Sequence, residues 1–166
     1  MENLLDKLSS YNVFNYLLSG VVFCVVADKY FSIPMLQDSI VIGLFLYYFI
    51  GLVISRFGSL ILEPVMKKLK VVEFSDYSDF LEAVKTDAKI EVLSETNNMY
   101  RSVLSTLTLL CLVFMGEAAI ERFPSLSSIF QYLALPIMVI LFGYAYKKQT
   151  SYIKKRVDAI KNSSDK

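Results

Sequence analysis

Four long apolar blocks constrain this chain more than any other feature. A bilayer core about 30 Å thick needs roughly 20 helical residues, and about 17 is the lower limit. Blocks three and four reach that length directly, and the first two reach it once their flanking residues are counted. The blocks occupy Val13–Ala27, Ile40–Ser55, Ser102–Ile120 and Ser128–Tyr146.

This pattern predicts an all-α polytopic membrane protein. None of the blocks has the polar stripe of a helix in a soluble bundle, and none alternates with the period of two that marks a strand. Hydrophobic residues make up 55% of the 166 residues, above the 45–50% of an ordinary soluble domain. We therefore expect a single domain over 1–166 with four transmembrane helices, at about 11–28, 38–58, 101–120 and 128–147.

Basic residues predict the orientation of these spans. Lysine and arginine are abundant in the second connection and in the tail, whereas the first and third connections hold one each, Lys29 and Arg122. The positive-inside rule then places the second connection, the tail and the N-terminus in the cytoplasm. The short outer connections join the spans into two hairpins. A cleaved signal peptide is a poorer interpretation of the first block, because Glu2 and Asp6 outweigh Lys7 in the segment before it.

The cytoplasmic parts are predicted to be helical. In the insert 64–99, Pro64 ends or kinks the helix that leaves the second block. After it, Ser75 is a candidate N-cap, and apolar residues recur at spacings of three and four. The tail 148–166 continues the fourth block as a helix, with no helix-breaking residue between them. The apolar positions of the helix in the insert are Tyr77, Phe80, Leu81, Val84, Ala88 and Val92.

Two interpretations of this amphipathic helix remain open. Its apolar face packs on its own bundle or a neighbouring subunit, or else Phe80, Leu81 and Val84 dock a cytosolic protein partner. The acidic excess between Glu73 and Glu95 argues against direct nucleic acid binding there.

Polar and small residues within the spans form three groups. Asn15 is expected to make an interhelical hydrogen bond, because a polar group in hydrocarbon is costly. Glu117 and Glu121 are candidates for an acidic ring at the outer mouth of an oligomeric pore. The alternative is that Glu117 reaches outward to the interface or pairs with Lys29 or Arg122. Small residues that allow close helix packing form a stripe in block two at Gly43, Gly51, Ser55 and Ser59.

The sequence offers no catalytic constellation. Histidine is absent, so the commonest general base and metal ligand is missing. Cys24 and Cys111 stand alone inside apolar blocks, without metal-ligand spacing. We expect no enzymatic activity, no cofactor and no metal site.

Two segments resemble small four-span inner-membrane proteins of bacterial phage-defence operons, of which the Kiwa-type membrane subunit is an example. These segments are SYNVFNYLLSGVVF in the first block and ETNNMYRSVLS at the start of the third. The resemblance implies a multi-pass homo-oligomer in the inner membrane, surrounded by membrane lipids. Such a protein would sense or alter membrane state and act with a cytosolic partner in antiviral defence. The alternative function is an ion channel or a membrane-permeabilising pore.

Overall fold

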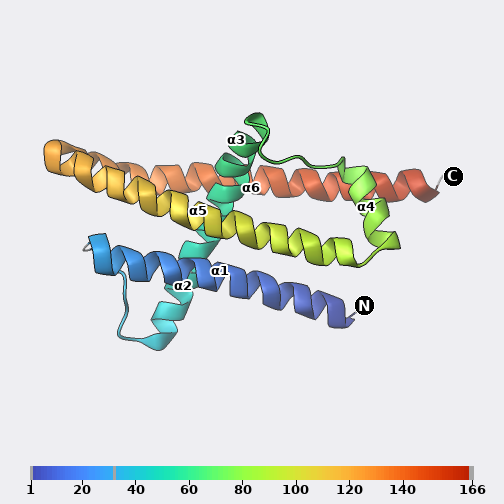
Figure 1. Ribbon diagram of the computed structural model, residues 1–166, viewed down its shortest axis with the longest axis horizontal. Coiled ribbons are helices and arrows are strands. Elements are labelled where there is room, and N and C mark those ends of the chain that lie inside the picture. The colour runs from blue at the N-terminus through green and yellow to red at the C-terminus, as the bar shows by residue number, and fades with distance from the viewer. Residues whose placement is uncertain (1, 32, 165–166) are drawn as a thin grey trace.

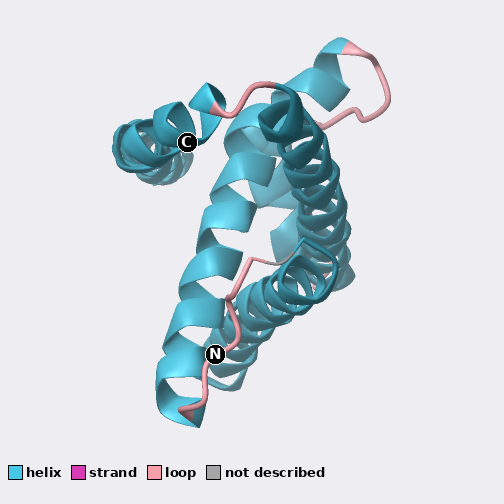
Figure 2. Ribbon diagram, turned by 90° about the vertical axis from the view of Figure 1, so that its left-hand side faces the viewer, coloured by secondary structure: helices cyan, strands magenta, loops and turns pink. Residues whose placement is uncertain are grey.

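A computed structural model describes the backbone of residues 2–31 and 33–164 and the side chains of residues 11–31, 33–129 and 132–161. Every regular element in these ranges is a helix, and only short loops join them (Figure 2). The elements are α1 (Glu2–Phe31), α2 (Ile40–Phe57), the π-helical turn η1 (Gly58–Leu62), α3 (Glu63–Lys68), α4 (Tyr77–Thr86), α5 (Lys89–Arg122) and α6 (Ser125–Ser164).

Three stretches of helix are long and apolar enough to cross a membrane. They are Tyr11–Phe31, Ile40–Lys68 and Lys89–Arg122, and they contain the first three apolar blocks. At most 28% of the most apolar part of each is buried within the chain. Side chains such as Ile40 and Phe45 are 80% and 75% exposed, and apolar surface on this scale requires lipid or another protein surface to cover it. The fourth predicted span lies within α6 and stays a prediction.

The long helices cross one another rather than forming a simple parallel bundle. In Figure 1, α1, α5 and α6 extend along the molecule, and the continuous rod made of α2, η1 and α3 runs across them. The start of α1, the end of α6 and α4 all lie toward the same end of the molecule in this view. The rod, α5 and α6, which are separate in the sequence, therefore pack together at one point.

Two glycines allow α1 and α2 to touch through their backbones. A Cβ atom at Gly20 would overlap the carbonyl oxygen of Tyr47, and one at Gly51 would overlap that of Tyr16. Both glycines are buried, and the Tyr16 and Tyr48 rings pack edge to face beside them, with centroids 5.7 Å apart. Close backbone approach of this kind is how small residues hold membrane helices together, because lipid provides no hydrophobic force between them.

The predicted amphipathic helix of the insert is wrong as a single element and is corrected to two pieces. It begins at Tyr77, after Asp76 rather than Ser75, and ends at Thr86, because Asp87 adopts an extended backbone. The carboxylate of Asp87 then accepts a hydrogen bond from the Lys89 N–H at 2.9 Å, as a helix-capping side chain does. Val92 therefore belongs to α5, and Ala88 lies in the break.

Candidate functional site

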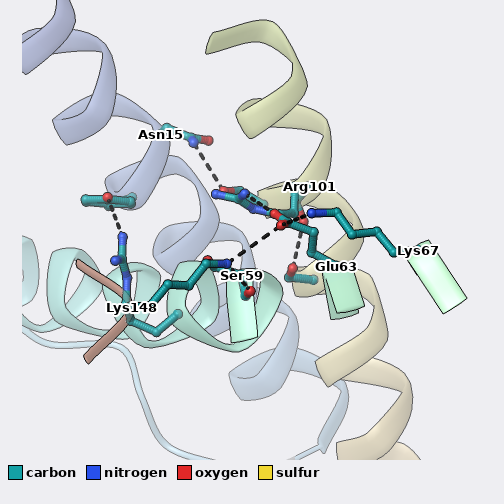
Figure 3. Close-up of polar contacts among 10 residues, drawn as sticks. Asn15, Ser59, Glu63, Lys67, Arg101 and Lys148 are labelled. Carbon is teal, nitrogen blue, oxygen red and sulfur yellow. Dashed lines mark hydrogen bonds and ion pairs between the residues drawn. The ribbon is translucent and has the colours of Figure 1, made fainter. Parts of the chain in front are cut away.

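A buried carboxylate, Glu63, lies where the rod crosses α5 and α6. Its side chain is 9% exposed and contacts three cations. Arg101 of α5 donates from Nη1 to Oε2 at 2.6 Å, and on the other oxygen Lys67 and Lys148 place their Nζ atoms at 3.2 and 3.7 Å. Figure 3 shows these side chains converging from α3, α5 and α6. We call Ser59, Glu63, Lys67, Arg101 and Lys148 the polar junction.

The local sequence explains why Lys148 is needed at this place. In η1 the Glu63 N–H donates to the Gly58 carbonyl, one residue further back than in an α-helix. The Ser59 carbonyl could be satisfied next by the N–H of residue 64, but this residue is Pro64, which has none. Lys148 replaces that missing donor: its Nζ lies 2.7 Å from the Ser59 carbonyl oxygen and 2.8 Å from the Ser59 Oγ.

Charge in the polar junction is unbalanced toward the positive. One carboxylate faces three cations, and a fourth, Arg56, lines a small cavity together with Ser59 and Lys148. Burial lowers the pKa of the Lys148 ammonium, and the negative charge of Glu63 opposes that effect. The ion pairs of Glu63 with cations from α3, α5 and α6 make this carboxylate an anchor between helices. The surplus positive charge makes the neighbourhood attractive to anions.

A second set of polar contacts joins α1 to the same region. Asn15 donates from Nδ2 to Ser102 Oγ at 3.1 Å, which is an interhelical hydrogen bond of the kind expected from the sequence. Arg56 donates from Nη2 to the Tyr16 hydroxyl at 3.1 Å, and the Tyr11 hydroxyl donates to the Glu95 carbonyl oxygen. The bonds of Asn15 and Tyr11 connect α1 to α5, which is distant in the sequence, and the bond of Arg56 connects α2 to α1.

Some buried polar atoms in this region have no protein partner. Among the described side chains these are Asn15 Oδ1, Arg56 Nε and Arg101 Nε. The adjoining cavity is only about 30 Å³, which is room for a water molecule and not for a substrate. The polar junction is therefore a cluster of charged and polar residues that holds helices together.

The small-residue stripe, which runs from α2 into η1, contacts α1 and α6. Gly51 touches α1, and Ser55 is buried at 3% exposure. The hydroxyl and carbonyl oxygen of Ser59 both contact Lys148 of α6. Gly43 is also buried, but the atoms nearest to a Cβ there belong to Tyr47 of its own helix. Gly20 and Gly58 were not predicted as packing residues from the sequence. At Gly58 a Cβ atom would overlap the hydroxyl of Ser105 on α5.

The predicted pore acids lie apart from the polar junction, near the end of α5. Glu117 is half-buried and Glu121 is exposed. Neither forms an ion pair with any side chain that the structure describes, so the alternative in which Glu117 pairs with Lys29 or Arg122 is not seen within one chain. Their role at a pore stays a prediction.

The predicted docking residues of α4 are only partly covered. Phe80, Leu81 and Val84 are all half-buried. The neighbouring ring of Tyr77 stacks on Phe80 and also contacts Tyr152 of α6, with centroids 5.6 Å apart. The α4 helix therefore rests partly on its own chain.

Glu63, Arg101 and Lys148 were not singled out from the sequence. One signal was present: Glu63 and Lys67 are four residues apart, a spacing that pairs opposite charges on a helix. Arg101 and Lys148 are distant in the chain and carried no such signal. Comparison with protein families, curated proteins and solved structures finds no match to this chain.

Proposed function

We propose that this protein is a homo-oligomeric inner-membrane protein that senses or alters membrane state and couples it to a cytosolic partner in bacterial anti-phage defence. The contact of Lys148 with Ser59 and Glu63 carries this proposal. It ties α6, which leads into the basic tail, to the rod and through Glu63 to α5. A change in how the apolar helices pack in the bilayer is thereby transmitted to the polar end of the molecule. The defence setting rests on the resemblance of the two segments.

The proposed topology has four spans, the fourth being residues 128–147 of α6, with both termini in the cytoplasm. It requires the rod, which runs across α1, α5 and α6 in Figure 1, to turn toward the direction of these helices in a bilayer. Its support is the alternation of basic charge between connections, together with the start of α1 and the end of α6 lying toward one end of the molecule (Figure 1). Fusing green fluorescent protein or alkaline phosphatase to the C-terminus tests it. We expect fluorescence without phosphatase activity, and phosphatase activity would overturn the proposed orientation.

The homo-oligomer follows from the resemblance of the two segments, and the apolar surface of α6 is open to a second copy of the chain as well as to lipid. Side chains such as Leu135, Val139 and Ile140 are 59–70% exposed in the single chain. Mass measurement of the protein in native-membrane nanodiscs tests this part of the proposal. We expect a multiple of the 18.9 kDa chain, and a monomer would overturn the oligomer.

The cytosolic partner is assigned to the half-buried face of α4. Purification of the tagged full chain from cells in mild detergent, before and during infection, should recover one soluble protein in stoichiometric amount. Phe80→Ser with Val84→Ser should abolish that recovery, and Lys85→Ser on the exposed face of α4 should leave it intact. Recovery of the chain alone, or equal recovery by both variants, would contradict docking on this face.

An ion-conducting pore is the second candidate function, and Glu117 favours it. A half-buried carboxylate inside an apolar stretch, without an ion-pair partner in its own described chain, fits a polar environment formed between subunits. Inducing the protein should then depolarise the membrane, and Glu117→Ala should reduce the effect while Glu91→Ala does not. Depolarisation that is absent, or unchanged in Glu117→Ala, would remove this function or this residue's part in it.

A further inference from the structure

A second, larger concavity lies on the side of α6 that faces η1. It is an open groove of about 360 Å³, lined by Leu60 of η1 and by one face of α6. The α6 residues recur at spacings of three and four, which places them on the same side of the helix. They are Tyr144, Lys147, Lys148, Ser151, Tyr152 and Lys155.

The two ends of this groove differ in chemistry. Tyr144 lies at the end that borders the apolar stretch of α6, and Leu60 of η1 adds an apolar side chain to the lining. Lys147, Lys148 and Lys155 supply positive charge beyond it, with the hydroxyl of Ser151 between them. A ligand that fits both ends is an amphiphile with an anionic head and an apolar body.

Two of the three lysines are available to such a ligand. Lys147 and Lys155 are exposed and have no carboxylate partner among the described side chains. Lys148 is shared, because its ammonium already contacts Ser59 and Glu63. Glu63 does not neutralise the positive charge of the groove, because its single negative charge is also paired with Arg101 and Lys67.

We propose that this groove binds the phosphate headgroup of an anionic phospholipid from the cytoplasmic leaflet. Lys147 and Lys155 hold the phosphate, Ser151 donates a hydrogen bond to it, and Tyr144 and Leu60 lie along the start of an acyl chain. The assignment rests on the proposed crossing of α6, which puts the Tyr146–Lys147 boundary at the headgroup level. Because Lys148 lines both the groove and the polar junction, the lipid acts on the contact that holds α6 to η1.

The test measures binding of phosphatidylglycerol to the purified full chain in detergent by native mass spectrometry, with phosphatidylcholine as the uncharged comparison. We expect bound phosphatidylglycerol, and about thirtyfold weaker binding in Lys147→Gln with Lys155→Gln, from the usual contribution of a basic residue near an anionic surface. Lys154→Gln with Lys161→Gln removes the same charge from α6 outside the groove, and it should bind as the wild type does.

Three results would overturn the assignment. They are equal binding of the two lipids, equal loss in the two double variants, and displacement of phosphatidylglycerol by millimolar inorganic phosphate, which would assign the groove to a free anion. The measurement involves no partner and no conduction. It can therefore succeed even if the proposed coupling fails, and the coupling can hold even if this groove binds no lipid.

Discussion

The Nζ atom of Lys148 lies 2.7 Å from the main-chain carbonyl oxygen of Ser59, 89 residues away in the sequence. The contact exists because η1 and Pro64 together deprive that carbonyl of a backbone donor. A side chain from another helix therefore completes the hydrogen bonding of the rod, and the same ammonium reaches Glu63. A change in the position of η1 or of α6 at this point therefore disturbs the other.

Removing the ammonium should loosen α6. Lys148→Met leaves the Ser59 carbonyl without its donor and Glu63 with one cation fewer. We expect a loss of about 1–3 kcal/mol in the free energy of unfolding in detergent, the usual range for a buried polar group that loses its partner. Lys148→Arg keeps the charge and donors and should retain most of the stability. A Lys148→Met variant as stable as the wild type would show that the contact contributes nothing.

Restoring a backbone donor should make Lys148 less important. Pro64→Ala returns an N–H that can bond within the rod and lets η1 relax toward an α-helix. In a double-mutant cycle, Lys148→Met should therefore cost less in the Pro64→Ala background than in the wild type. We expect a coupling of about 0.5–3 kcal/mol, as for residues that share a partner. Additive effects would contradict our explanation of the Ser59 contact.

The crossing of α1 and α2 should tolerate no side chain. Gly20→Ala or Gly51→Ala forces a Cβ atom into a backbone carbonyl, so the helices must move apart. We expect each change to lower the free energy of unfolding by about 1–3 kcal/mol or more, as overpacking does. Gly116→Ala and Gly143→Ala are matched controls, because nothing lies within 4 Å of a Cβ atom there. These controls should be neutral or gain up to about 1 kcal/mol in helix propensity.

Breaking the hydrogen bond between Asn15 and Ser102 should lower stability, because it leaves a buried polar group without a partner. Ser102→Ala leaves the buried Asn15 amide without an acceptor, and we expect a cost of about 1 kcal/mol in thermal unfolding measurements. Asn15→Leu combined with Ser102→Ala removes both polar groups and should recover much of that loss. If the double variant is no more stable than Ser102→Ala, the bond has no measurable weight.

Features that depend on local composition were predictable from the sequence, within limits. The apolar blocks predicted four spans, and three helices of the structure are long and apolar enough to cross a membrane. The tail KKQTSYIKKRVDAIKN continues α6 as a helix, as predicted. The pair Glu63–Lys67 was also accessible, because an i,i+4 spacing is local. The break at Asp87 was missed, because the apolar spacing of three and four continues through it. At that point the Asp87 carboxylate accepts a hydrogen bond from the Lys89 N–H, and the helix is interrupted although the apolar spacing continues.

By itself the sequence determined which segments must be helical and apolar, because hydrogen-bond satisfaction and transfer into lipid depend on composition along a single stretch of chain. Only the tertiary structure decided which side chains meet. Gly51 belonged to a visible stripe, but its counterpart Gly20 did not, and nothing local linked Lys148 to Ser59. The physical reason is that a carbonyl without a backbone donor, or a carboxylate among cations, acquires its partners from the geometry of crossing helices, which no spacing within one helix encodes.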